Sequence, residues 1–310
     1  MGAVLIYKYG EMLRLIDVPH SRSSHSKITP RAGGIGIWLS FILITILLAN
    51  NYKMAVLGGI AGLCGLSDDI FNISAKARLL IYLFISGVSV FLYGGNYNLL
   101  IAILWMLFIT GTLNVYNFMD GINGMAGLTG VICFGLTAYF SYFIHKDSEV
   151  SNISICLITG CLSFLPFNFP KARVFMGDVG SIFLGLMFAL FVLRLSNGIA
   201  EFLCVSMFLY TFHSDATLTI LYRLRDGEDL TTPHRRHLYQ YLCNELRVPH
   251  WKVSLSYAII QLIFGIISII AYSKGIIWQL VFFAISIMIF VSSYKMIKEI
   301  PQEINEEPIR

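Results

Sequence analysis

Two aspartates, Asp68 and Asp69, stand side by side at the end of a glycine-rich apolar run. Adjacent carboxylates repel each other unless a cation or a basic partner offsets their charge. Mg²⁺ is bound by one or two carboxylates together with phosphate oxygens, and one aspartate of such a pair can instead act as a general base. The pair therefore predicts a metal site or a base, with a helix cap as the alternative. Lys76 and Arg78 follow as basic partners.

A second polar cluster lies in the segment NVYNFMDGING, where side chains recur every three residues at Asn114, Asn117, Asp120 and Asn123. This spacing gives one polar stripe along the end of a helix. Amides and a carboxylate in such a stripe can hydrogen-bond a flat polar ligand, and the intervening glycines would let that ligand approach the backbone. A polar seam that joins helices is the alternative.

A third cluster is FNFPKARVFMGDVGS, residues 167–181, in which Asp178 lies between two glycines just before an apolar run. A carboxylate at a helix N-terminus can cap that helix. It can also hold a metal while the free backbone N–H groups meet phosphate oxygens. Phe175 could stack on a flat base.

A fourth cluster combines His213, Asp215 and Arg223 with the motif PHRRHLYQ. In that motif two histidines three residues apart would share a helix face, and the two arginines between them suit a diphosphate because guanidinium offers a forked pair of donors. The segment DVPHSRSSHSKITPRAGG, residues 17–34, is also basic, and an ordinary basic loop is its alternative.

The elements that must position these clusters are apolar. The chain is 56% hydrophobic and 13% charged, and its mean hydropathy is +0.72. A helix needs about 20 apolar residues to cross a bilayer core of about 30 Å. We therefore expect an all-α polytopic membrane protein that forms one domain over residues 1–310, and Met1–Tyr9 looks like the tail of a helix that began earlier. The expected spans, about ten in number, lie near residues 34–50, 53–67, 79–93, 99–117, 126–144, 152–168, 180–195, 198–216, 253–272 and 276–296.

With these spans the connections alternate between two faces, and most of the 22 Lys and Arg residues fall on one of them. That face is predicted to be cytoplasmic by the positive-inside rule. It holds all four clusters and the longest loop, residues 217–252. Few ionisable groups lie mid-membrane, where pumps and carriers place them, so we expect an enzyme at the membrane surface. A metal-bound diphosphate with a flat end group, that is, a nucleotide sugar, fits these clusters.

From Asp17 to Gln240 the chain resembles the bacterial polyprenyl-phosphate N-acetylhexosamine-1-phosphate transferases. These enzymes move a sugar 1-phosphate from a UDP-sugar to a polyprenyl phosphate and release UMP. The resemblance rests on five motifs in order, namely the 17–34 segment, GLSDDIFNISAKARLL, NVYNFMDGINGMAGLTG, NFPKARVFMGDVGSIFLG and PHRRHLYQ.

The resemblance also implies roles for individual residues. These are Mg²⁺ ligands (Asp178 and Asp69), catalytic groups that activate the lipid phosphate (Asp68 or Asp69), nucleotide-binding residues (Asn117, Asp120, Asn168 and Phe175), lipid-phosphate-binding residues (Lys76 and Arg78) and diphosphate- or sugar-binding residues (His234, Arg235, Arg236 and His237).

The resemblance further implies an enzyme of the bacterial inner membrane that starts O-antigen-like surface polysaccharides, with its active site on the cytoplasmic face. Its partners would be a UDP-N-acetylhexosamine, undecaprenyl phosphate and the bilayer, with no nucleic acid. Mg²⁺ is the expected cofactor, with Mn²⁺ as the alternative ion. The sequence does not decide the sugar, the existence of a homodimer, or direct attack against a covalent aspartyl intermediate.

Two departures from the family pattern bear on this expectation. Asn123 stands where many members have a second aspartate, and the first span of the fold is largely missing. The motif PHRRHLYQ is not the longer histidine run of the phospho-muramoyl-pentapeptide branch and is closer to the branch that starts surface polysaccharides. An inactive assembly homologue and a lipid-linked transporter are the alternative functions. The four retained aspartates argue against the first, and the lack of polar residues through the membrane depth argues against the second.

Overall fold

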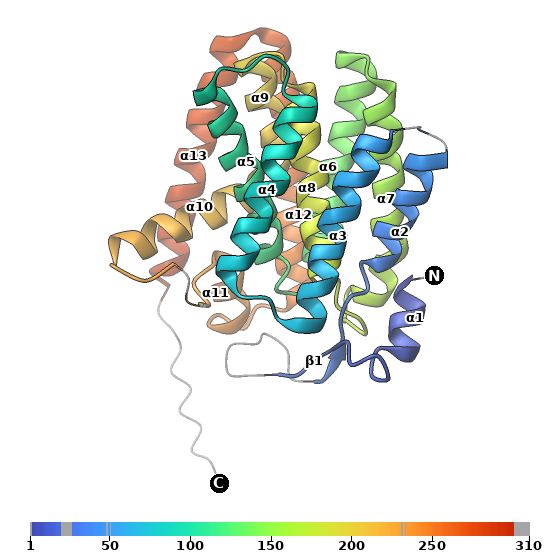
Figure 1. Ribbon diagram of the computed structural model, residues 1–310. Helices are drawn as coiled ribbons and strands as arrows, with labels where there is room; N and C mark the ends of the chain where they lie inside the picture. Colours follow the sequence, from blue (N-terminus) through green and yellow to red (C-terminus); the bar gives the residue numbers. More distant parts are fainter. Residues whose placement is uncertain are drawn as a thin grey trace.

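The computed structural model describes residues 2–19, 27–47, 49, 51–230, 232 and 234–300 (Figure 1). Over these residues the fold is helical apart from one two-stranded antiparallel sheet, in which Ile16 pairs with Pro30 and Asp17 with Thr29. The elements in chain order are α1 (Gly2–Tyr9), β1 (Ile16–Asp17), β2 (Thr29–Pro30), α2 (Ile35–Leu47), α3 (Tyr52–Phe71), α4 (Ala75–Tyr93), α5 (Leu99–Met119), α6 (Met125–Tyr139), η1 (Phe140–His145), α7 (Ser148–Asn168), α8 (Asp178–Leu195), α9 (Ile199–Ser206), η2 (Met207–Leu209), α10 (Tyr210–Arg225), α11 (Leu238–Asn244), α12 (His250–Lys274) and α13 (Ile276–Lys298).

The expectation of an all-α polytopic membrane protein is confirmed. Among the described residues, 8 helices are long and apolar enough to cross a membrane. They are α3, α4, α5, α6 continued by η1, α7, α8, α12 and α13. The shorter helix α2 is apolar but spans only Ile35–Leu47.

The predicted span at 198–216 is divided, and this is a difference from the expectation. Helix α9 ends at Ser206, the short 3-10 helix η2 follows, and α10 begins at Tyr210 and runs in a different direction (Figure 1). Gln261 of α12 bridges the break, because its side-chain amide donates to the carbonyl of Met207 (2.8 Å) and its oxygen accepts from the backbone N–H of Thr211 (3.0 Å). Backbone groups released inside a membrane need such a partner.

The segment 217–252, predicted as a loop, is partly helical. The second half of α10 extends to Arg225, and α11 and the first turn of α12 also lie within it. Sequence favoured a loop because the charges are dense, whereas these helices lie at the end of the bundle and not inside the bilayer.

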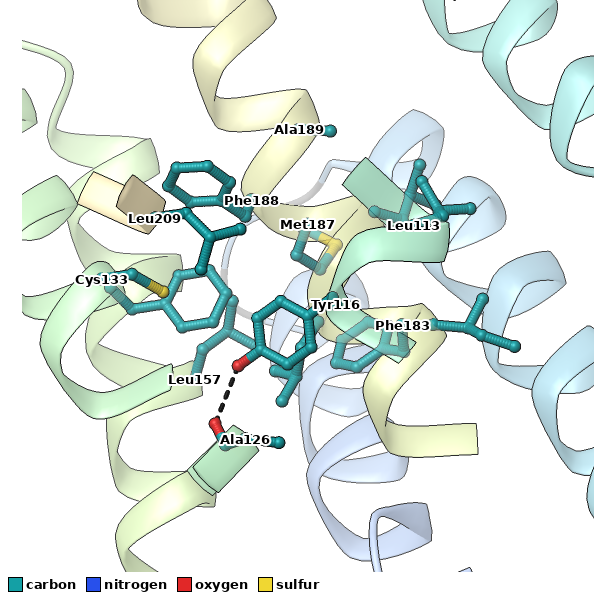
Figure 2. Close-up of a cluster of buried hydrophobic side chains, with 14 of the residues drawn as sticks. Leu113, Tyr116, Ala126, Cys133, Leu157, Phe183, Met187, Phe188, Ala189 and Leu209 are labelled. Atoms are coloured by element: carbon teal, nitrogen blue, oxygen red, sulfur yellow. Dashed lines mark hydrogen bonds between the residues drawn. The ribbon is translucent and has the colours of Figure 1, made fainter. Parts of the chain in front are cut away.

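Helix α8 forms the core of the bundle and packs between α3 and α5. In its most apolar stretch 89% of the residues are buried, against 11% in α13 at the periphery. Figure 2 shows aromatic side chains from α5 and α8 interlocking, with the hydroxyl of Tyr116 donating to the carbonyl of Ala126 across 2.9 Å. Gly65 of α3 lets α8 come close, since a Cβ there would collide with the backbone of Asp178.

Both ends of α8 are fixed by charged or polar contacts. At one end Arg194 pairs with Asp147 (2.7 Å) and Glu149 (2.7 Å), which lie at the start of α7. At the other end α8 begins with Asp178, beside the last turn of α3. We call this second end of the bundle the site end; it is the lower end in Figure 1, where β1 and α11 also lie.

Candidate active site

Asp69 caps helix α8 from the neighbouring helix α3. Its Oδ1 accepts the backbone N–H of Asp178 and its Oδ2 that of Val179, both at 3.1 Å. The carboxylate is 2% exposed and occupies the positive end of the helix dipole. Gly177 makes room for it: φ there is +74°, and a Cβ would lie 2.7 Å from Oδ2 of Asp69. Asp69 thus fixes where Asp178 stands.

Asp68 and Asp178 converge on a single guanidinium. Nη1 of Arg78 lies 2.6 Å from Oδ2 of Asp68 and 3.5 Å from Oδ2 of Asp178. The other oxygen of Asp68 accepts the backbone N–H of Ile73 at 2.6 Å. Asp68 is buried, whereas the side chains of Arg78 and Asp178 are each 29% exposed. A substrate can therefore reach the pair from the Asp178 side.

This carboxylate pair fits a divalent cation. Both carboxylates lie close to Arg78, which supplies one positive charge, and Asp178 is the partly exposed member of the pair. We call the exposed side of Asp178 the opening. Within the described part of the chain no three His, Cys, Asp or Glu residues come together as a metal-ligand group. An ion held by Asp68 and Asp178 would complete its shell with water and phosphate oxygens, as Mg²⁺ prefers.

Two of the predicted motifs, residues 17–34 and 167–181, meet beside this opening. The backbone N–H groups of Gly33 and Gly34 donate to the carbonyls of Phe175 (2.9 Å) and Met176 (2.8 Å), and Phe175 donates back to Pro30 (2.8 Å). The ring of Phe175 is half-buried. Residues 20–26 of the first motif lie outside the described residues.

Arg31 is a functional candidate to which the sequence assigned no role. Its guanidinium donates to the backbone carbonyl of Asp69 and to Oδ1 of Asn72 (3.3 Å), and its Nε lies 3.8 Å from Oδ1 of Asp69. It brings a second cation to the end of α3. In the sequence, the feature that could have indicated Arg31 is its position just before the glycine pair of the 17–34 segment.

Asn117 and Asn168, both predicted to bind the nucleotide, have different surroundings. Asn117 is half-buried and donates to Oγ of Ser181 in the first turn of α8 (3.1 Å), beside the Asp178 opening. Asn168 is 4% exposed, and both ends of its amide bind backbone: Oδ1 accepts from Gly124 (2.6 Å) and Nδ2 donates to Val174 (2.9 Å). Through these two hydrogen bonds Asn168 links the loop at Gly124 to the loop at Val174.

Asp120 ends helix α5 at the same end of the bundle. Burial, with a smaller effect of the nearby Asp69 charge, raises the pKa of its carboxyl well above the ordinary value. Asn123, three residues on, donates weakly to the carbonyl of Pro170 (3.5 Å) and accepts a hydrogen bond from Ser254 (2.7 Å) through its own carbonyl. Asn123 therefore joins loops.

The histidine–arginine segment, residues 234–237, is brought to the site end by α11. The hydroxyl of Tyr239 donates to the carbonyl of Phe118 at the end of α5 (2.8 Å). Arg236 is paired with two carboxylates of its own loop, Asp226 (2.6 Å) and Glu228. Burial lowers the pKa of His234 to about 4, so this ring is neutral at physiological pH.

Not all predicted residues come together. One connected cluster consists of Asp68, Asp178, Arg78 and Asn117. Asp69 holds this cluster in place because it accepts the backbone N–H of Asp178. Lys76 is exposed on the first turn of α4. Arg235 and His237 lie in the separate α11 segment, where Pro233 is outside the described residues.

Acidic and basic groups thus gather at one end of a bundle of membrane-spanning helices. Such a site suits the binding of a metal-bound phosphate. Residues 51–196, from the N-cap of α3 to the C-cap of α8, match the family model described as Glycosyl transferase family 4. Over this stretch, which is just under half of the chain, the protein is similar to glycosyl transferase family 4. The stretch that matches the family 4 model contains Asp68, Asp69, Asp120 and Asp178.

Named relatives of this chain include two undecaprenyl-phosphate transferases and a phospho-N-acetylmuramoyl-pentapeptide-transferase. A probable undecaprenyl-phosphate N-acetylglucosaminyl 1-phosphate transferase of Bacillus subtilis is 28% identical over 94% of this chain and 86% of its own length. An undecaprenyl-phosphate alpha-N-acetylglucosaminyl 1-phosphate transferase of Thermotoga maritima is 23% identical over 84% of this chain and 83% of its own. A phospho-N-acetylmuramoyl-pentapeptide-transferase of Oceanobacillus iheyensis is 26% identical over 79% and 85%.

Proposed function

We propose that this protein transfers an N-acetylhexosamine 1-phosphate from a UDP-sugar to undecaprenyl phosphate. The products are undecaprenyl-diphosphate-sugar and UMP, and the reaction starts a surface polysaccharide on the cytoplasmic face of the bacterial inner membrane. The observation that carries the proposal is the Asp68–Arg78–Asp178 cluster at the ends of membrane-spanning helices. Both substrates of such a reaction carry phosphate, and one of them lies in the bilayer. The relatives' names support the same assignment.

The proposed cofactor is Mg²⁺, held by Asp178 and Asp68. When bound it supplies Lewis-acid stabilisation of the diphosphate charge. Asp69 was expected to share in metal binding. Since both of its oxygens accept backbone N–H groups, we now assign it the task of holding Asp178 in place.

In the proposed reaction an oxygen of the lipid phosphate forms a bond to the sugar-bearing phosphorus. The bond from that phosphorus to the bridging oxygen breaks, and UMP leaves with the electron pair. Arg78 and the exposed Lys76 offset phosphate charge at the opening. Because a phosphate monoester loses its second proton near pH 6, Asp68 has little proton transfer to perform. In the rival covalent scheme an aspartate attacks first and is then displaced by the lipid.

For the nucleotide we propose Asn117 and Asp120 at the end of α5 and Phe175 in the loop before α8. Asn168 supports this site by holding the Gly124 and Val174 loops together. His234–His237 are the proposed contacts to the diphosphate or sugar. For Arg236 to take part, it must exchange its pairs with Asp226 and Glu228 for phosphate oxygens.

An apolar hollow offers a place for the prenyl chain. A cavity of about 390 Å³ lies between α5, α9, α10 and α13, and its wall is almost wholly apolar. A second hollow of about 540 Å³ continues towards the far end and shares Phe108 and Phe202 with the first. Residues of α5 and α9 line both hollows.

The test is UMP release by the purified protein in vesicles that contain undecaprenyl phosphate and Mg²⁺. A panel of UDP-N-acetylhexosamines serves as donors, and UDP-N-acetylmuramoyl-pentapeptide tests the alternative suggested by the third relative. We expect UMP from an N-acetylhexosamine donor, its loss in Asp178→Asn, and no change in Glu299→Gln, an exposed carboxylate at the end of α13. UMP from the pentapeptide donor alone would reassign the substrate.

A further inference from the structure

Asp215 is a fully buried carboxylate to which the proposed reaction assigns no role. It lies on α10 and is 0% exposed. Its Oδ1 accepts from the backbone N–H of Leu238 (2.9 Å) and from Oγ1 of Thr219 (3.2 Å). Its Oδ2 accepts from the backbone N–H of Tyr239 (3.2 Å) and from the hydroxyl of Tyr257 (2.7 Å). Three helices, α10, α11 and α12, thus meet at one carboxylate.

The ring of His237 lies directly beside this carboxylate. Its Nδ1 is 3.4 Å from Oδ1 of Asp215, and the side chain is 3% exposed. The ring is also enclosed laterally, by His234 with centroids 5.0 Å apart and by Tyr239 at 5.7 Å. Among the described residues Nδ1 is buried and makes no hydrogen bond of standard geometry, and a looser capping-box contact points the backbone N–H of Gln240 at the His237 side chain.

A buried charge is costly unless it is bound by several donors, and Asp215 is bound by four. Two of them, Leu238 and Tyr239, are the first backbone N–H groups of α11, which directly follows His237. The carboxylate therefore sets the position of the helix that carries the ring and also faces one edge of the ring. When one imidazole nitrogen points its proton at a carboxylate, the other nitrogen is left to face a ligand.

We propose that Asp215 is a positioning residue that acts on the reaction through His237. It anchors the N-terminus of α11 and holds Nδ1 of His237, so that Nε2 is directed to the diphosphate or sugar of the donor. This inference rests on the proposed function. Spacing in the sequence does not show that Asp215 and His237 are partners, since 21 residues separate them.

The kinetic test is a double-variant cycle of Asp215→Asn and His237→Ala, with UMP release measured as a function of the UDP-sugar concentration. Each single change is expected to lower kcat/KM by about 10- to 100-fold, the usual effect of losing a partner that orients a functional histidine. Both should divide the loss between KM and kcat in the same way. The double variant should be no slower than His237→Ala alone. Losses that multiply would overturn the proposal, because Asp215 would then act independently of the ring.

Two further variants keep the test decisive if Asp215→Asn does not fold. Tyr257→Phe removes one donor to Asp215 and leaves its charge in place. Its smaller loss of kcat/KM should disappear in the His237→Ala background, and persistence of that loss would contradict the proposal. Ser268→Ala is the matched control, since it removes a buried hydroxyl from the same helix α12 far from α11. It should change neither KM nor kcat in either background.

Hydrogen exchange separates this proposal from the proposed function. In Tyr257→Phe and Asp215→Asn the amides of Leu238 and Tyr239 should exchange faster than in the unaltered protein, whether or not the protein releases UMP. Unchanged exchange at these two amides would overturn the anchoring role of Asp215. If the unaltered protein releases no UMP from any donor while exchange does rise, the proposed function fails and the anchoring stands.

Discussion

At the scale of the residue, adjacent aspartates on one helix have different tasks. Consecutive side chains of a helix point in directions about 100° apart. Asp69 therefore faces α8 and caps it, while Asp68 faces Arg78 and the opening. The sequence predicts the pair as chemically important, but it cannot tell which member caps and which binds, because that depends on where α8 lies.

This difference predicts opposite effects of two equivalent substitutions. Asp69→Asn leaves one of two backbone N–H groups without an acceptor and should lower the free energy of unfolding by about 1–3 kcal/mol. Asp68→Asn should lower the rate of UMP release by about 100-fold or more, because it removes a charge that faces the substrate. Thermal unfolding in detergent and the UMP assay measure the two effects. Unchanged stability of Asp69→Asn would show that Asp69 is not a structural cap.

Asp120 gives a prediction about pH. Its folded pKa is raised, by burial first and by the Asp69 charge second, so the fold favours the neutral carboxyl. Stability from this group is present at low pH and is lost as pH rises through the raised pKa, because the unfolded chain ionises at its ordinary, lower pKa. Asp120→Asn should therefore raise the melting temperature at neutral pH, with a smaller gain near pH 4.

If Asp120 binds the nucleotide, the same variant loses UMP release while it gains stability. A variant that is less stable at neutral pH would show that the charged form of Asp120 does not destabilise the fold.

Asn168 illustrates the limit of the sequence at this scale. An amide near a conspicuous motif looks like a ligand-binding group, yet both of its ends are used by the backbone of neighbouring loops.

At the scale of the element, hydropathy predicts most spans to within a few residues. It fails at 198–216, where the apolar run is continuous and the helix is not. The backbone groups at the break are bound by Gln261, which lies on α12 and is distant in sequence. No local pattern in the run records that partner, so only the folded arrangement reveals the break.

Gln261→Leu should therefore destabilise the divided span. It leaves the N–H of Thr211 and the carbonyl of Met207 without their side-chain partner, and each such buried group costs about 1–3 kcal/mol. The melting temperature in detergent should fall, whereas Ser273→Ala, an exposed residue on the same helix, should leave it unchanged. An unaltered melting temperature for Gln261→Leu would mean that the break is held by other contacts.

At the scale of the whole molecule, the polar clusters gather at one end of an apolar bundle (Figure 1). The sequence predicts this gathering from the alternation of spans and the charge of the connections. It does not predict which clusters touch. Asp68, Arg78 and Asp178 form one cluster, while His237 pairs with Asp215 in another, because contacts between α3, α4 and α8 and between α10 and α11 are set by packing.

The proposed orientation can be tested with single cysteines. A cysteine in place of Lys76 at the site end should react with a membrane-impermeant maleimide only after cells are permeabilised. One in place of Lys274, at the exposed far end of α12, should react in intact cells. The native cysteines in the described chain are buried or half-buried, and the unaltered protein measures their background. The reverse pattern would place the site outside the cytoplasm.

Helix α8 is fixed at both of its ends, near the two surfaces of the membrane. Its 18 residues span about 27 Å, with the Asp69 cap at one end and the Arg194 ion pairs at the other. It cannot tilt or slide without breaking one of these attachments, and little lipid touches it. A thicker or thinner bilayer therefore has to be accommodated by outer helices such as α13, which leaves the distance between Asp68 and Asp178 independent of lipid length. We therefore expect the site to keep its dimensions in different lipids, because the helix that carries Asp178 is shielded from lipid by the other helices.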